Sequence, residues 1–581
     1  MEDRPWPAAS RRLFILMAAG FVLIAYGLMW GLPNLYDFAQ DSVVPQGNLA
    51  QVKAPFEKVT AFRYPPFHFL VLRAFFLPAR PLLRISGLAE NLKVASTLFI
   101  LIARLVSVAM ALGALGLIYA TGRRLWDERT GWAAALLFVL SPVTLYYAKN
   151  ANLDIPCLFW LAVALFFYVR IQQENRERDY LWLGVSAALA VCTKDQAYGF
   201  LLLMPVVLLL RLRARLKLPL REFLPRALEL AWPAALGFAV PFVLIHNILF
   251  EPPEFLRHVS VIIGPGSEGW RQFSGGLVGQ LRLLLETALR LCDAWTLAGL
   301  ALAIFGLAVA FREDGERRTR LATLVPVISY HLSFLVVIGY VPTRYVLPML
   351  LVLAPFAGRG AVSLWRGGGL GRIAVVGLTA WIGLAGLCVD YAMSEYPQYD
   401  AQQWLERHAS AETQLFYVGD MRDMPRFNAP LNAHSVERTA EAIQSLSPPA
   451  DLIVLSFAPG EAAGGTRQSR ISSVLRRHLG DWGLVRSASG GKGFLERLVA
   501  GEFGYTEAAR FESPICAWVP EIAESLNRTI VILGRKGGRF QQEGTNVTGQ
   551  SSHNAGKSWS DGGNGLFPGL GCICKFGTFV P

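Results

Sequence analysis

Three aspartates lie where apolar segments of this chain end. Asp37 and Asp41 follow the first apolar segment, and Asp154 follows a later one. A carboxylate at a membrane edge is costly unless it is solvated, paired or used in function. It can act as a general base when a substrate proton lies within hydrogen-bond reach. The alternative is a helix cap, and Asp154, which precedes Ile-Pro, fits an N-cap with proline in the first turn.

Cationic residues also lie near the ends of apolar segments: Arg63, Lys149, Lys194 and Arg344. Such groups suit a phosphate, which arginine can bind through two hydrogen bonds. The alternative is anchoring, because long cationic side chains at a membrane edge commonly extend to water. Arg344 is the strongest candidate for binding, since it lies on the side where the charge pattern leaves few cations. Arg104, inside an apolar run, either pairs with an acid or extends outward.

The composition indicates that these residues are positioned by membrane-spanning helices. Of the 581 residues, 53% are hydrophobic and 17% are charged, and mean hydropathy is +0.37. Many apolar runs reach the roughly 18–20 residues needed to cross a bilayer. The net charge of +12 comes from short basic clusters between these runs, which favours membrane anchoring over nucleic-acid binding. The sequence therefore predicts a polytopic α-helical membrane protein.

About eleven apolar runs are long enough or nearly long enough to span, and we expect eleven to thirteen transmembrane helices. Basic clusters fall on every second loop, which places the N-terminus in the cytoplasm. The same alternation puts the first outer loop (32–95), Asp154, Lys194, Arg344 and everything after Tyr391 on the opposite face. Two amphipathic stretches, Tyr64–Ala79 and Gly276–Leu291, are expected to lie in the membrane interface.

Beyond the transmembrane region (1–391) the chain is more polar. Residues 392–536 alternate short β-like runs, such as DLIVLSF, with helical stretches, which predicts a small extracytoplasmic α/β domain. Residues 537–581 are rich in Gly, Ser and Asn, and we expect a disordered tail. The seven cysteines and eight histidines form no metal-site spacing, so no cofactor is evident. A divalent metal held by other ligands stays open.

Four stretches resemble the GT-C superfamily of membrane glycosyltransferases, most closely the dolichyl/polyprenyl-phosphate mannosyltransferase and aminoarabinose-transferase branch. They are listed in chain order: the aspartates of the first outer loop followed by YPPFH, the span ARLVSVAMALGALGLIYATGRRLW, the segment SPVTLYYAKNANLDIP, and the motif RYVLP. Each stretch alone is a weak signal, but their order on this topology is fairly specific. The resemblance covers residues 10–400 well and 400–536 loosely.

The resemblance implies an inverting transfer of a sugar from a polyprenyl-phosphate donor to an acceptor hydroxyl on a lipid, a glycan or a protein, at the extracytoplasmic face of the plasma (inner) membrane. A first-loop aspartate would act as catalytic base. We prefer Asp41 to Asp37, although the mannosyltransferase branch commonly carries Asp-Glu where this chain has Asp41-Ser42. Asp154 would support the base. The other implied residues are as follows: Arg344, Arg63, Lys194 and Lys149 around the donor phosphate, and Tyr64, His68, Asn152 and Tyr345 lining the acceptor side.

Two other classes compete with a transferase. A transporter or flippase would also carry intramembrane charges and broken spans. However, the sequence has no internal repeat in two halves, and a carrier needs neither the long outer loop nor the C-terminal domain. In a non-catalytic scaffold, the carboxylates would be dispensable.

Overall fold

The computed structural model describes residues 8–39, 42–43, 64–263, 271–428, 430–457, 494–512, 526, 528–537 and 540. Residues 1–541 form one compact unit. The predicted tail, 537–581, lies almost entirely outside the described residues, and so do Asp41 and Arg63.

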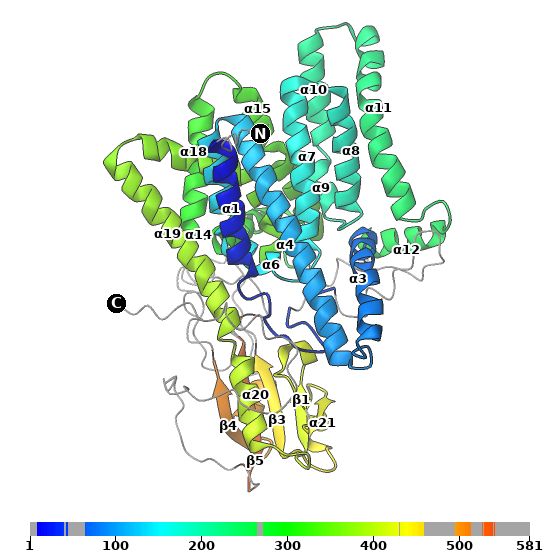
Figure 1. The fold of residues 1–581 in the computed structure, drawn as a ribbon, viewed down its shortest axis with the longest axis vertical. Coiled ribbons are helices and arrows are strands. Elements are labelled where there is room, and N and C mark those ends of the chain that lie inside the picture. The colour runs from blue at the N-terminus through cyan, green and yellow to red at the C-terminus, as the bar shows by residue number, and fades with distance from the viewer. Residues whose placement is uncertain are drawn as a thin grey trace, which may run out of the picture. The chain divides into compact units, whose positions relative to one another are not determined.

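Eight helical segments of the described chain are long and apolar enough to cross a membrane (Figure 1). They are α4 (Leu92–Leu125), α7 (Asp154–Glu174), α9 (Ala197–Leu201) with α10 (Met204–Leu216), α11 (Leu220–Ile245), α14 (Leu277–Arg312), α15 (Arg317–Ala322) through α16 (Val325–Tyr330), η1 (His331–Leu335) and α17 (Val336–Ile338), η2 (Thr343–Val346) with α18 (Leu347–Arg366), and α19 (Gly369–Ser394) with α20 (Pro397–His408). A bent pair, α5 (Glu128–Val139) and α6 (Pro142–Ala148), makes a ninth if it counts as one span. The predicted polytopic helical fold is confirmed.

This count, taken over the described residues, is below the eleven to thirteen expected, because some of the apolar runs form short or bent helices. The run at 179–192 forms α8 (Glu177–Val191), whose 15 residues extend only about 23 Å, less than the roughly 30 Å hydrocarbon core. The run at 130–147 is broken by a 69° bend between α5 and α6. The first run forms α1 (Ala8–Ala25), which is not among the eight.

The two amphipathic stretches that were expected to lie in the membrane interface, Tyr64–Ala79 and Gly276–Leu291, form different structures. The first forms a separate helix, α3 (Phe67–Ile85). The second is continuous with the following span in α14, interrupted only by Thr296, whose backbone is not helical. One further short helix, α12 (Pro252–Ile263), follows α11.

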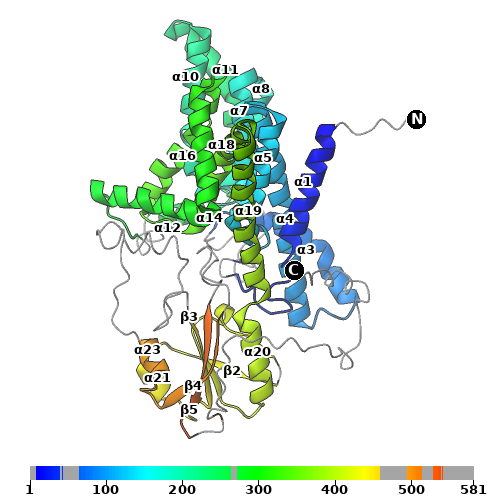
Figure 2. The ribbon, with the colours of Figure 1, turned by 90° about the vertical axis from the view of Figure 1, so that its left-hand side faces the viewer.

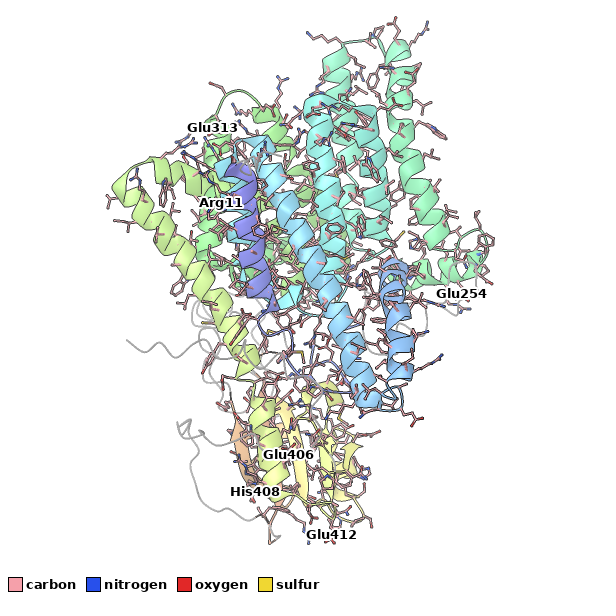
Figure 3. The ribbon with its side chains drawn as sticks, in the orientation of Figure 1. Arg11, Glu254, Glu313, Glu406, His408 and Glu412 are labelled. Atoms are coloured by element: carbon pink, nitrogen blue, oxygen red, sulfur yellow. The ribbon has the colours of Figure 1, made fainter. Side chains whose placement is uncertain are left out.

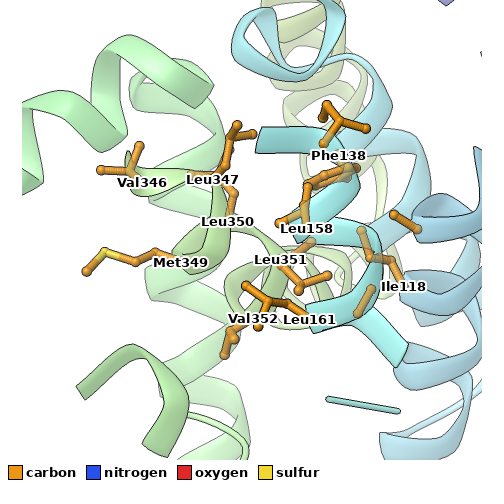
Figure 4. Close-up of a cluster of buried hydrophobic side chains, with 14 of the residues drawn as sticks. Ile118, Phe138, Leu158, Leu161, Val346, Leu347, Met349, Leu350, Leu351 and Val352 are labelled. Atoms are coloured by element: carbon orange, nitrogen blue, oxygen red, sulfur yellow. The ribbon is translucent and has the colours of Figure 1, made fainter. Parts of the chain in front are cut away.

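Close backbone contact holds the bundle together around α18. Lipid tails are as apolar as leucine, so packing rather than water exclusion drives helix association in a membrane. Gly306 of α14 and Gly360 of α18 let these helices touch: a Cβ at Gly306 would lie 1.8 Å from the Phe356 carbonyl oxygen, and one at Gly360 would lie 2.3 Å from that of Leu302. In Figure 4, apolar side chains of α18 interleave with those of α5, α7 and α4, and these side chains are buried.

The C-terminal region forms a five-stranded mixed sheet in the order β2-β1-β3-β5-β4. The strands are β1 (Leu415–Val418), β2 (Ala433–Val436), β3 (Leu452–Phe457), β4 (Tyr505–Phe511) and β5 (Thr529–Arg535). β1 pairs in parallel with β2 and β3, whereas β5 is antiparallel to β3 and β4. The predicted α/β character is confirmed, and β1, β3 and β5 coincide with the three predicted strands. The boundary at residue 392 stays a prediction.

Helices cover both faces of this sheet, with α20 on one face and α21 (Ala440–Gln444) and α23 (Phe494–Val499) on the other (Figure 2). Side chains of β3 alternate between the faces: Leu452 and Val454 pack with Leu405 of α20, whereas Ile453 and Leu455 pack on the opposite side. A strand buried on both faces has a continuous apolar run rather than an alternating one, which explains DLIVLSF.

Candidate active site

The centre of the candidate site is an ion pair between two helix ends. Asp154 begins α7, and Lys194 lies in the turn between α8 and α9. Lys194 Nζ donates to Asp154 Oδ1 at 2.6 Å, and both side chains are largely buried. Asn152 Oδ1 accepts a hydrogen bond from the Asp154 backbone N–H at 3.0 Å. Asp154 is thus a first-turn residue, where the helix dipole favours an anion, and Leu153 is the N-cap.

An aromatic ring joins this pair to a third chain segment. Lys194 Nζ lies 5.4 Å from the centre of the Tyr345 ring, and Arg344 Cζ lies 5.5 Å from the same centre. The Tyr345 hydroxyl is 3.1 Å from that of Tyr340. The short helix η2, which precedes α18, therefore carries Arg344 and Tyr345 to the Asp154–Lys194 pair. The structure brings together Asp154, Lys194 and Arg344, which the sequence alone assigned to one face.

The start of α3 lies against the same turn. The Phe67 backbone N–H donates to the Cys192 carbonyl oxygen at 2.9 Å, two residues before Lys194. Tyr64, three residues earlier, is half-buried and packs against the apolar cluster that includes Phe69 and Leu72 of α3. His68 is buried, and neither ring nitrogen has a hydrogen-bond partner among the described residues.

A second charged cluster lies on α14 beside Arg344. Arg290 Nε is 2.9 Å from Glu286 Oε1, and Arg290 Nη1 is 3.8 Å from Asp293 Oδ2 and donates to Thr343 Oγ1 at 3.4 Å. Both carboxylates are buried. This cluster was not predicted from the sequence. Its members are spaced by four and three residues, which places their side chains on one face of a helix and could have predicted the cluster.

Asp195 makes a contact that the sequence did not indicate. Its Oδ1 is 3.1 Å from Nε2 of the buried His258, on α12. This contact joins α12 to the turn that carries Lys194. The partners are 63 residues apart, and neither stands in a recognisable pattern.

Asp37 and Arg104 form a separate buried pair. Arg104 Nη2 donates to Asp37 Oδ1 at 2.7 Å, and both side chains are fully buried. Arg104 also donates to the Leu28 carbonyl oxygen, and Asp37 Oδ1 accepts from the Ala39 N–H at 3.0 Å. Of the two alternatives left open for Arg104, the structure shows pairing with an acid, and this acid is one of the candidate catalytic residues.

Lys149 also forms its contacts with buried groups. Its ammonium group pairs with Asp390 of α19 and donates to the Tyr26 carbonyl oxygen at 2.7 Å. Its side chain is fully buried. Lys149 thus ties the end of α6 to α19 and to the residues that follow α1.

Asp41 and Arg63 cannot be compared with the expectation, because both lie outside the described residues. The described chain two residues after Asp41 is nonetheless informative. The Val43 N–H donates to the Ala151 carbonyl oxygen at 2.8 Å, in the turn that carries Asn152 and leads to Asp154.

Burial and neighbouring charges act in opposite directions on the ionisable groups. Burial by itself lowers the pKa of Lys194, but the carboxylate of Asp154 and the adjacent Tyr345 outweigh it, so the pKa is raised and the ammonium persists. Burial and the Tyr345 hydroxyl raise the pKa of Tyr340, which stays a hydrogen-bond donor. Burial lowers the pKa of His68 to about 3, so that imidazole is neutral. Within the described chain, no three His, Cys, Asp or Glu side chains are grouped to hold a metal ion.

The fold and the site together define a multi-pass integral membrane protein with cationic and acidic groups gathered at helix ends. Residues 95–231 match the family model of the dolichyl-phosphate-mannose-protein mannosyltransferases. This segment contains Asp154, Lys194 and Asn152. The match confirms the predicted resemblance to this family of glycosyltransferases over residues 95–231.

No curated protein matches the chain in sequence. Among solved structures, ArnT from Cupriavidus metallidurans without ligand is 14% identical, with 90% of this chain and 98% of that chain covered and a TM-score of 0.44. The same protein bound to undecaprenyl phosphate gives a TM-score of 0.39 at the same identity and coverage. An oligosaccharyltransferase from Archaeoglobus fulgidus, with zinc and sulfate, is 12% identical over 76% of this chain and 68% of that chain, with a TM-score of 0.36. The family match, rather than these distant similarities, supports the class.

Proposed function

We propose that this protein transfers a sugar from a polyprenyl-phosphate donor to an acceptor hydroxyl at the extracytoplasmic face of the membrane. The observation that carries the proposal is the buried Asp154–Lys194 pair, with Arg344 across the Tyr345 ring from Lys194. The pair lies in the segment that matches a family of lipid-phosphate-sugar transferases. Cations at such a position suit a lipid-linked phosphate, because the lipid tail stays in the bilayer while the phosphate reaches the helix ends.

Arg344 is the principal phosphate-binding residue in this proposal. Lys194, which is held in place by Asp154, lies across the Tyr345 ring from Arg344 and contributes a second positive charge. Arginine presents several donors in a fixed plane and can bind two phosphate oxygens at once. The contacts of Lys149 with Asp390 favour a structural role for Lys149 instead of the predicted donor contact.

Asp41 is the proposed base. Asp37 is less suited, because one of its oxygens is held by Arg104 and its side chain is fully buried. The contact between Val43 and Ala151 supports Asp41, since it brings the chain two residues beyond Asp41 onto the turn that leads to Asp154. Asp154 then acts as a positioning residue that holds Lys194 in place.

The reaction is a single displacement. Asp41 removes the proton from the acceptor hydroxyl, and the hydroxyl oxygen forms a bond to the anomeric carbon. The bond from that carbon to the phosphate oxygen breaks, and its electron pair stays on the lipid phosphate. Arg344 and Lys194 stabilise the charge that develops there, and because they are already in place, this stabilisation needs no reorganisation. Attack from the opposite side inverts the anomeric configuration.

The orientation is part of the proposal. Arg11 and Glu313 lie toward one end of the helices (Figure 3), where Glu313 pairs with Arg320 at 3.0 Å and also with Arg359. Basic residues concentrate at this end, which the positive-inside rule assigns to the cytoplasm. A reporter fused after Tyr391 should be active only outside the cytoplasm. A cytoplasmic signal would separate the C-terminal region from the proposed face and contradict the orientation.

The testing experiment is a transfer assay in liposomes. Purified protein receives polyprenyl-phosphate sugars and a membrane extract as acceptor. Asp41→Asn should abolish transfer, whereas the matched control Asp314→Asn, in the exposed connection after α14, should retain it. Movement of the lipid across the bilayer without transfer, unaffected by Asp41→Asn, would instead indicate a flippase.

A further inference from the structure

A polar cavity of about 310 Å³ lies where α19 passes into α20. All eight of its lining residues have polar side chains: Ser394, Glu395, Tyr396, Tyr399, Asp400, Gln402, Gln403 and Arg426. The volume is at the lower end of the range for small-ligand sites, about 300–1,000 Å³. None of these residues belongs to the Asp154–Lys194 cluster.

One wall of the cavity is held rigidly. Arg426 Nε donates to Gln402 Oε1 at 2.7 Å, and Nη1 donates to the Pro33 carbonyl oxygen at 3.3 Å. The guanidinium group lies over the Tyr399 ring, 5.4 Å from its centre. The Tyr399 hydroxyl in turn accepts from the Gly31 N–H at 2.7 Å. This wall is a planar cation stacked on an aromatic ring, with little freedom to move.

Two carboxylates of the cavity are available to a ligand, whereas Gln403 Oε1 already accepts a hydrogen bond from Arg407 Nη2 at 3.4 Å. Neither Glu395 nor Asp400 forms an ion pair or side-chain hydrogen bond in the described part of the chain, and both side chains are exposed. Together with Arg426, they give the cavity a net charge near −1, which disfavours phosphate and other anions. Carboxylates accept hydrogen bonds from hydroxyls, and the amide of Gln403 can both donate and accept.

The cavity adjoins the segment that leads to the proposed base. The Phe38 ring packs against Tyr396 and Tyr399, with ring centres 5.6 and 6.3 Å apart. Phe38 lies three residues before Asp41 in the chain. A ligand held at Tyr399 is therefore one aromatic layer from the described end of the first outer loop.

We propose that this cavity binds a hydroxylated sugar ring of the acceptor. Carboxylates and amides suit the vicinal hydroxyls of a sugar, because they accept and donate the hydrogen bonds that such hydroxyls form. The inference rests on the proposed transferase function and adds a sugar-containing acceptor to it. The reacting hydroxyl would extend from the bound ring toward the first outer loop.

Direct binding tests the cavity independently of catalysis. The probes are the methyl glycosides of mannose, glucose and galactose, observed by saturation-transfer NMR on the full chain in nanodiscs. At least one should give signals that fall about fivefold in Asp400→Asn and Gln403→Ala and persist in the control Glu412→Gln, an exposed residue after α20 (Figure 3). Equal signals in all variants, or binding of ethanolamine in place of glycosides, would overturn the proposal.

Kinetics separate this inference from the proposed function. Asp400→Asn should raise the acceptor KM about tenfold, as expected when a hydrogen bond to a charged group is lost, and leave kcat and the donor KM unchanged. Transfer that depends on Asp41 but is indifferent to Asp400 would reject the cavity and keep the transferase. Glycoside binding that depends on Asp400, in a protein without transferase activity, would reject the function and keep the cavity.

Discussion

Removing the carboxylate of Asp154 should destabilise the protein by about 3–5 kcal/mol, because Lys194 then stays buried and charged without its partner. The two charged atoms are 2.6 Å apart, and the side chains are 3% and 13% exposed. At an effective dielectric constant near 20, charges at this separation attract by about 6 kcal/mol. Moving the two ions out of water costs several kcal/mol each. The attraction between them offsets this cost only while both partners are present.

A double-mutant cycle measures this coupling. Asp154→Asn, Lys194→Met and the double variant are unfolded in detergent, and free energies of unfolding are compared with the parent and with Asp314→Asn. The double variant should cost about 2–3 kcal/mol less than the sum of the single variants, because it leaves no buried charge unpaired. In the transfer assay, Lys194→Met should lower kcat by less than the roughly 10²–10³-fold expected for Arg344→Ala, because Arg344 is the principal phosphate-binding residue.

Two results would refute this reasoning. Single-variant costs that add to within about 0.5 kcal/mol would mean that the two side chains do not interact energetically. A Lys194→Met variant that folds and transfers sugar at the parent rate would remove Lys194 from the phosphate site, whatever its effect on stability.

The remaining predictions concern the other buried polar groups and the helix contacts. Asp37→Asn should lower the free energy of unfolding by about 3–5 kcal/mol, because Arg104 would then be buried without its carboxylate partner. The folded fraction should keep its specific activity. A loss of activity without a loss of stability would instead identify Asp37 as the base. Arg344→Ala should reduce kcat about 10²–10³-fold, with partial recovery in the lysine variant, whereas a pure KM effect would contradict a role in the transition state. Neutral His68 stabilises the fold fully at pH values above its ordinary pKa of about 6.5. Because the pKa of His68 in the folded protein is about 3, the free energy of unfolding should fall as the pH drops from about 6.5 to about 3, by up to about 1.4 kcal/mol per pH unit. Thermal unfolding of His68→Leu should depend less steeply on pH over this range. Gly306→Ala should lower the melting temperature measurably, because its Cβ has no room against α18, and an unchanged melting temperature would contradict the close helix contact.

The membrane character and the C-terminal α/β region could both be predicted from the amino-acid sequence. The physical reason is that both are local properties. A run of about 20 apolar residues must be helical in lipid, since no other structure satisfies its backbone there. Likewise, the continuous run DLIVLSF predicted the central strand β3 without knowledge of its neighbours. The alternation of basic loops was equally local, and it grouped Asp154, Lys194 and Arg344 before any contact was known.

The pairing of the charged residues, in contrast, could be seen only in the folded protein. Asp37 was a candidate catalytic carboxylate in the sequence, although Asp41 was preferred, and its pairing with Arg104 depends on the packing of α4 against the segment after α1. Lys149 resembled a phosphate ligand until its contact with Asp390, which is 241 residues away, was seen. A charge in a membrane protein must find a partner, but the sequence does not record which distant charge the helix packing brings within reach.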